Sequence, residues 1–295
     1  MHDNPQADPA TNFALPDHRV ISLTGRDAVA FAQAQFMNDV DAIGAGQWQW
    51  NGWLTPKGRV IALFALLRID DQTVWLLLPD ADPVAMATAL QRYVFRSKLA
   101  IAVREDLKVS AALVAPGQAR GARLATLPAD VIEMDLGADG GSRSLRIAVD
   151  DHAEAEANAA LLARWAAFDL QHGLPRLPAS QVEQWTPQQL SLERLQAFSV
   201  KKGCYPGQEI VARTHFLGKA KRGLALVEGD RPLAAGAPLH AAGSDSALGT
   251  LVACASIAEH RYLALAVVPL QRDAGALVVD GMAVHEIALG EGLAR

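Results

Sequence analysis

The densest group of chemically useful side chains lies in the C-terminal half of the chain. Residues 194–222 contain one acid, Glu209, and seven basic residues: Arg194, Lys201, Lys202, Arg213, Lys219, Lys221 and Arg222. The segment has a charge of +6 in a chain of formal charge −5, so the remaining residues carry −11. Such a reversal predicts a site for a carboxylated small molecule, a phosphate or a nucleic-acid backbone, with a solvated basic face as an equal alternative.

Cys204 is the best candidate for a reactive group in this segment. It follows Lys201 and Lys202 and precedes a predicted turn, after which residues 208–213 are expected to begin a helix. Positive charge from the lysines and from a helix N-terminus stabilises a thiolate, the form that attacks electrophiles and binds metals. The alternative is a buried cysteine that packs as a small apolar group, which is the interpretation we prefer for Cys254 in its apolar surroundings.

Composition restricts the class of protein. The chain has 295 residues, 51% of them hydrophobic and 20% charged, which predicts a globular protein of two or three domains. No apolar run approaches the roughly 18 residues that a membrane span needs, and the polar start is unlike a signal peptide. With only two cysteines, we expect a protein of the reducing cytoplasm. The formal charge of −5 argues against a generic polyanion binder or a membrane-surface coat, and we expect a monomer that binds neither membrane nor DNA.

Helices and hairpins alternate without the regular rhythm of a parallel sheet, so the sequence predicts an α+β fold. Helices are expected in residues 25–38, 82–93 and 153–170, with a hairpin of strands at 60–69 and 73–78. Further strands are expected at 99–103 and 109–114. Asn51-Gly52, which follows the alternating stretch Gln47 to Trp50, predicts a tight hairpin turn. Residues 173–190 are rich in Pro, Gln and Ser and predict a long surface connection.

Three parts are expected along the chain. Residues 1–16 form a flexible tail, residues 17–221 the main body, and residues 222–295 a C-terminal β-barrel. The barrel is predicted from short strand candidates at 224–227, 249–253, 261–267 and 277–279, which are separated by turns that contain Gly and Pro. The main body is expected to contain two subdomains, and the expectation allows one of them to be discontinuous in sequence.

The run Lys202-Gly203-Cys204-Tyr205-Pro206-Gly207-Gln208-Glu209 resembles the K-G-C-Y-x-G-Q-E signature of the YgfZ family, folate-binding proteins related to the glycine-cleavage T-protein. Weaker matches extend over most of the chain, and they include residues 25–28, 33–40, 57–59, 93–98 and 212–215. The resemblance implies a T-protein-like body of antiparallel sheets and helices that is capped by a β-barrel.

The resemblance also implies a function. Proteins of this family bind tetrahydrofolate or a one-carbon derivative and support the assembly or repair of iron-sulfur clusters in client enzymes, including enzymes that modify tRNA. Carried onto this chain, it makes Cys204 the functional cysteine, as a redox thiol or a transient cluster ligand, with Lys202 beside it. The residues implied in folate binding are Gln171, Tyr205, Gln208, Arg213 and Arg222.

Departures from the T-protein pattern argue against aminomethyl transfer. T-protein relatives have an acidic pair after a Gly-Gly turn, whereas Gly58 here precedes Arg59 and three apolar residues. The glutamate that holds the pterin is replaced by Gln171, which forms hydrogen bonds but carries no charge. Gln208 likewise stands where the T-protein motif has an arginine. These losses predict a folate pocket that has been kept without its original reaction.

Two alternatives from other classes stay open at this point. The first is a folate-dependent aminomethyl or one-carbon transferase whose catalytic acid would be Asp39 or Asp41. The second is an RNA-binding module that works through the basic segment, with an affinity that falls steeply with salt.

Overall fold

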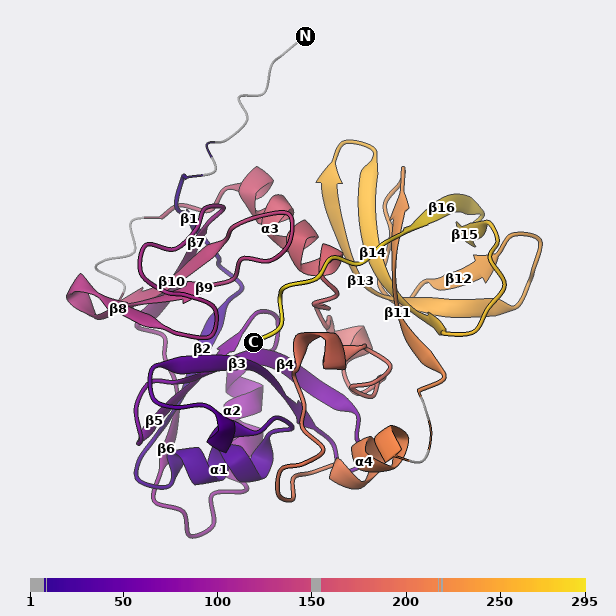
Figure 1. Cartoon of the computed structure of the whole chain (residues 1–295). Coiled ribbons are helices and arrows are strands. Elements are labelled where there is room, and N and C mark those ends of the chain that lie inside the picture. Colours follow the sequence, from indigo (N-terminus) through magenta and orange to yellow (C-terminus); the bar gives the residue numbers. More distant parts are fainter. Residues whose placement is uncertain (1–7, 9, 150–154, 217, 219) are drawn as a thin grey trace.

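The computed structural model describes residues 8, 10–149, 155–216, 218 and 220–295. Two five-stranded antiparallel sheets and a closed six-stranded barrel make up the fold (Figure 1). The first sheet has the order β3-β4-β5-β2-β6, with bounds β2 Arg19–Thr24, β3 Gln47–Leu54, β4 Val60–Arg68, β5 Thr73–Leu78 and β6 Ala100–Val103. The helices α1 (Ala28–Gln35) and α2 (Pro83–Gln91) pack on one face of this sheet in a separate apolar core. The helices predicted in residues 25–38 and 82–93 and the β4–β5 hairpin are thus confirmed.

The hairpin predicted at Asn51-Gly52 is wrong, because β3 runs straight through these residues. The chain turns later, where the amide of Gly58 donates to the carbonyl of Thr55 at 2.9 Å. Gly52 is needed for close packing instead, since a Cβ there would lie 2.7 Å from the Met37 Cε and 2.9 Å from the Ala62 carbonyl oxygen. Asn51-Gly52, a pair typical of turns, therefore lies inside a tightly packed strand.

The second sheet, β1-β7-β10-β9-β8, faces the first sheet across the main core. Its strands are β1 Phe13–Ala14, β7 Leu107–Ala112, β8 Ala125–Leu127, β9 Val131–Asp135 and β10 Ser144–Val149. The helix α3 (Ala159–Gln171) follows, and it begins later than residue 153, where the sequence predicted its start. Residues 153 and 154 of the predicted helix lie outside the described residues. The Asn158 side chain caps the helix by accepting a hydrogen bond from the Leu161 amide.

The C-terminal barrel is confirmed, with the strand order β11-β14-β13-β12-β15-β16. Its strands are β11 Arg222–Gly229, β12 Pro238–Ala241, β13 Ala247–Ala258, β14 Arg261–Pro269, β15 Leu277–Val279 and β16 Met282–Ile287. The sequence patterns identified four of these strands and missed β12 and β16. Leu263 and Leu265 pack outward against Ala167 and Leu170 of α3, which attaches the barrel to the body.

The segment after β16 returns to the centre of the molecule, where the C label lies in Figure 1. The Trp50 indole donates to the Leu293 carbonyl at 2.8 Å, and the Leu293 side chain is 2% exposed in the main core. The Arg295 guanidinium donates to the carbonyls of Asp135 and Gly137. Residues 289–295 therefore complete the core of the N-terminal body. Within the described residues, no helix is long and apolar enough to cross a membrane.

Candidate functional site

Cys204 lies in the irregular segment between a 3-10 turn at Leu192–Leu195 and the helix α4 (Gln208–Phe216). Its side chain is exposed and is not in a disulfide. The predicted helix after Gly207 is confirmed and begins at Gln208. Cys254, by contrast, is half-buried on β13, and burial raises the pKa of its thiol to about 12. Cys204 is thus the accessible thiol of the two.

Lys202 anchors the cysteine segment to α1. Its ammonium is buried and donates to the carbonyls of Gln33, Phe36 and Asn38, where α1 ends. Cations are favoured at such a C-terminus, where helix carbonyls lack partners within the helix. Burial lowers the pKa of Lys202 to about 8, although the nearby carboxylates of Asp39 and Asp41 act to raise it. This ammonium therefore acts first as a structural clamp, directed at α1.

Two glycines fix the other side of the segment. Gly207 has a φ of +82°, and a Cβ there would lie 2.6 Å from the Thr55 carbonyl oxygen and 2.8 Å from the Gly58 Cα. Gly58 has a φ of +69°, and its own Cβ would lie 2.8 Å from the Ile210 Cβ. The turn between β3 and β4 and the start of α4 therefore touch through main chain, which side chains at either glycine would prevent.

We expect the substitution Gly207→Ala to lower the free energy of unfolding by about 2 to 4 kcal/mol, because it combines a left-handed backbone with a clash against main chain. Denaturant unfolding measures this loss. Gly203→Ala is the matched control, since a Cβ at Gly203 would meet nothing within 4 Å. Equal stability of the two variants would contradict the proposed contact.

The residues implied in folate binding do not converge on one point. Tyr205 and Gln208 lie in the same segment as Cys204, and both side chains are used internally. The Tyr205 hydroxyl donates to the Ser199 carbonyl, and the Gln208 side-chain Nε2 donates to the Lys202 carbonyl. Burial raises the pKa of Tyr205 to about 12.

The other three predicted residues lie on separate elements. Gln171 ends α3 with its side chain exposed, and its carbonyl accepts from the Gly290 amide at 2.8 Å. Arg213 is exposed on α4, and Arg222 begins β11, where it donates to the Leu248 carbonyl at 3.2 Å. Their assignment to folate therefore stays a prediction.

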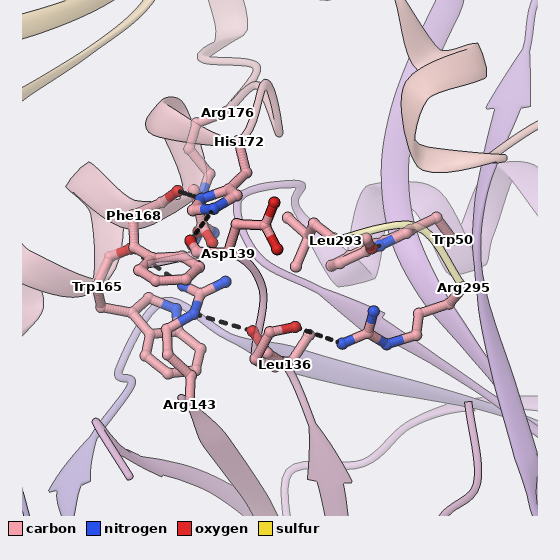
Figure 2. Close-up of polar contacts among 12 residues, drawn as sticks. Trp50, Leu136, Asp139, Arg143, Trp165, Phe168, His172, Arg176, Leu293 and Arg295 are labelled. Carbon is pink, nitrogen blue, oxygen red and sulfur yellow. Dashed lines mark hydrogen bonds and ion pairs between the residues drawn. The ribbon is translucent and has the colours of Figure 1, made fainter. Parts of the chain in front are cut away.

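The basic segment does not form one cationic face. Arg194 pairs with Glu291 at 2.9 Å and donates to the Gly290 carbonyl, while Lys202 is buried at the end of α1. Lys219 lies outside the described residues. His172, which directly follows α3, is also buried, and its ring nitrogens lie 2.8 Å from the carbonyls of Phe168 and Asp139 (Figure 2). Arg194 and Lys202 are therefore used to hold the fold together, while Lys201, Arg213 and Lys221 are exposed.

A buried cationic network, which the sequence did not indicate, joins α3 to the second sheet. The Arg143 guanidinium is 1% exposed and lies 4.2 Å and 4.0 Å from the ring centroids of Trp165 and Phe168 (Figure 2). It donates to one carboxylate oxygen of Asp169 at 2.7 Å, and Arg176 pairs with the other. Burial lowers the pKa of Arg143, and the charge of Asp169 opposes that shift.

This network borders a groove of about 640 Å³ beside α3. The groove is lined by Leu15 to Arg19, Pro79 to Pro83, Leu162, Trp165, Ala166 and Arg176. An adjoining inner cavity of about 20 Å³ shares His18, Trp165 and Arg176 with it and reaches Trp50. Cys204 lines neither of them. The Arg176 Nε is buried and has no hydrogen-bond partner within the described part of the chain.

Asp80 and His18 have unusual electrostatic surroundings in this groove. Burial raises the pKa of Asp80 to about 6, although the charge of Arg176 and a hydrogen bond from the Leu177 amide act to lower it. Burial, together with the charges of Arg176, Arg143 and Arg19, holds the pKa of His18 well below its usual value. At neutral pH the groove therefore combines a carboxylate, a neutral imidazole and a guanidinium along an apolar wall.

We expect Asp80→Asn to stabilise the protein by about 1 to 2 kcal/mol at pH 7.5 and to have little effect at pH 4. The folded protein retains the Asp80 proton to a higher pH than the unfolded chain does. The free energy of unfolding of the native protein therefore falls as the pH rises from about 4 to 6, and asparagine removes this loss. Urea unfolding at both pH values tests it, with the exposed Asp245→Asn as control; a pH-independent difference would contradict the assignment.

Comparison with known proteins places this architecture. No protein-family model matches the sequence. The crystal structure of the glycine cleavage system aminomethyltransferase T from Bartonella henselae is similar with a TM-score of 0.73, over 94% of this chain and 84% of that chain, at 14% identity. The fold is therefore that of the aminomethyltransferase T class.

Sequence similarity is more specific than the fold. The tRNA-modifying protein YgfZ of Cronobacter sakazakii is 30% identical over 238 residues, which cover 73% of this chain and 70% of that protein. The chain belongs to the YgfZ family. The resemblance found in the sequence motif is thus confirmed, as is the α+β fold with a C-terminal barrel.

Proposed function

We propose that this protein is a folate-binding accessory factor that supports iron-sulfur cluster assembly or repair in client enzymes, including enzymes that modify tRNA. The observation that carries the proposal is the exposed Cys204 thiol on a segment whose main chain is fixed on two sides. Lys202 clamps it to α1, and Gly207 packs on Gly58. A rigid mount with an accessible sulfur suits a thiol that acts on a partner.

Cys204 supplies one thiolate ligand, whereas an iron-sulfur cluster takes four, so the cluster is treated as cargo shared with the client. Lys202 is a positioning residue in this proposal, because its ammonium is held by the carbonyls at the end of α1. Thiol–disulfide exchange is the other form of the same role: the Cys204 thiolate would attack a disulfide of the client, form a mixed disulfide and release the other client sulfur as a thiolate.

Folate fits the groove beside α3 better than the inner cavity. Sites for ligands of this size usually have volumes of roughly 300 to 1,000 Å³, a range that includes the groove at about 640 Å³ but excludes the cavity at about 20 Å³. The pterin ring offers a ring N–H beside an amino group, two donors that the Asp80 carboxylate accepts together. Trp165 supplies an apolar wall, and Arg176 contributes a guanidinium cation to the lining.

Aminomethyl transfer is not favoured by the residues near the β3–β4 turn. Arg59 follows Gly58, and its guanidinium donates to the Gln184 carbonyl at 2.7 Å. The residues after it enter β4, which is mostly buried and apolar. Of the two alternative acids, Asp39 accepts from the Gln33 side chain at 2.8 Å, and Asp41 is exposed. Folate therefore acts in this proposal as a bound ligand of the groove, which Cys204 does not line, and not as a reactant in aminomethyl transfer.

We expect Asp80→Asn to weaken binding of tetrahydrofolate at least tenfold, because an amide presents one acceptor oxygen in place of two. Anaerobic equilibrium dialysis at pH 7.5 measures the affinity. Since the same substitution is expected to stabilise the fold, lost affinity cannot be attributed to unfolding. Ala166→Phe, which fills the groove from α3, is expected to weaken binding as well; unchanged affinity in both variants would place the folate elsewhere.

We expect Cys204→Ala to abolish support of iron-sulfur client enzymes in cells while the protein keeps its stability and its folate affinity. The exposed thiol makes little contribution to packing, so its loss affects only chemistry at the sulfur. Activity of tRNA-thiolating or other cluster enzymes in a strain lacking the native protein measures the effect. Cys254→Ala is the matched control. Normal client activity with Cys204→Ala would refute the role.

A further inference from the structure

The loop after α2 presents aromatic and basic side chains that the proposed function does not use. Residues 92–98 contain Arg92, Arg96 and Lys98, which are all exposed, and no acid. The Phe95 side chain is 83% exposed and Tyr93 is 48% exposed. The loop therefore shows two rings and three cations to solvent in a chain of formal charge −5.

The loop is held firmly in this conformation. The carboxylate of Asp27, next to the start of α1, accepts from the Lys98 amide at 2.6 Å. Gly25 lies so close that a Cβ there would be 2.3 Å from the Lys98 carbonyl oxygen. The Tyr93 ring packs edge-to-face on Trp53, with centroids 6.2 Å apart. The exposed Phe95 ring is therefore displayed by an anchored loop.

Phe95 and its neighbours have the chemistry of a stacking platform. The Arg96 guanidinium lies 5.3 Å from the Phe95 ring centroid, which places a cation beside a ring on which a base can stack. Proteins bind single strands by stacking bases on such rings and by placing cations along the phosphates. A docked folded protein would bury about 800 Å² on each side, which requires a broader surface than two rings among cations.

We propose that the loop of residues 92–98 binds unpaired nucleotides of an RNA loop, with a base stacked on Phe95 and phosphates paired with Arg92, Arg96 and Lys98. RNA is chosen because its loops and bulges present unstacked bases, which is where proteins read RNA. Arg26, exposed at the base of the loop, extends the cationic surface, although Asp27 lies 3.7 Å from its Nε. The proposal does not depend on folate binding or on cluster chemistry.

Helix α1 links this surface to the cysteine segment. Its N-terminal end holds the Lys98 main chain through Asp27, and its C-terminal carbonyls hold the Lys202 ammonium. Eight residues of helix are roughly 12 Å long. RNA bound on the loop would therefore lie at one end of the helix whose other end fixes the Cys204 segment.

The test uses the full chain and a fluorescein-labelled, unstructured RNA of twelve uridines, followed by fluorescence anisotropy at low salt. We expect saturable binding, which Phe95→Ala weakens by roughly 5- to 100-fold through loss of one stacked base. The double variant Arg92→Glu, Arg96→Glu should also reduce the slope of log affinity against log salt by about 1.4, since each lost phosphate contact removes about 0.7.

Matched controls come from other faces of the chain. Phe216→Ala removes a ring that is 68% exposed on α4, and Arg231→Glu reverses an exposed charge in the barrel; both should bind as the native protein does. The proposal is overturned by an absence of saturable binding or by equal losses in Phe95→Ala and Phe216→Ala. Tighter binding of a twelve-nucleotide thymidine DNA than of the RNA would also overturn the proposal. So would displacement of the RNA by oligo-glutamate of equal charge, which would indicate an acidic protein partner.

Discussion

The contact between Gly58 and Gly207 is the constraint on which the cysteine site depends. Two main-chain segments separated by about 150 residues meet without intervening side chains, and both glycines have a left-handed conformation that other residues adopt at a cost. The Lys202 ammonium adds a second fixed point at the end of α1. Between these two points the Cys204 side chain is exposed to solvent, so the fold holds the main chain of the cysteine in place while the sulfur stays accessible to a partner.

A second constraint is the buried ion network around Asp169. Removing one partner from such a network leaves an uncompensated charge in a low-dielectric interior, which is far more costly than the net contribution of the intact pair. Arg143 is enclosed by two aromatic rings, while Arg176 reaches from the same carboxylate to the groove. The groove wall is therefore held in place on the side of Arg176 by a buried ion pair.

The sequence predicted those features that depend on local pattern. The helices, the β4–β5 hairpin and most barrel strands follow from periodicity and turn residues, and the cysteine motif identified the family. Prediction from the sequence failed where contacts between separate segments determine the role of a residue. Gly52 allows close packing against Met37, and Lys202 caps a helix more than 160 residues earlier in the chain. The sequence around Arg143 gave no indication of its buried role, because that role depends on two aromatic rings and a carboxylate that lie on α3.

The return of residues 289–295 to the N-terminal body has a consequence for biosynthesis. Trp50 and Leu293 are separated by 243 residues, yet they share a hydrogen bond inside one core. At ribosomal speeds of about 5 to 20 residues per second, roughly 10 to 50 seconds pass between the emergence of the two. During that interval the nascent sheet lacks its final apolar cover, so the emerging polypeptide is a natural substrate for chaperones that shield hydrophobic surface co-translationally.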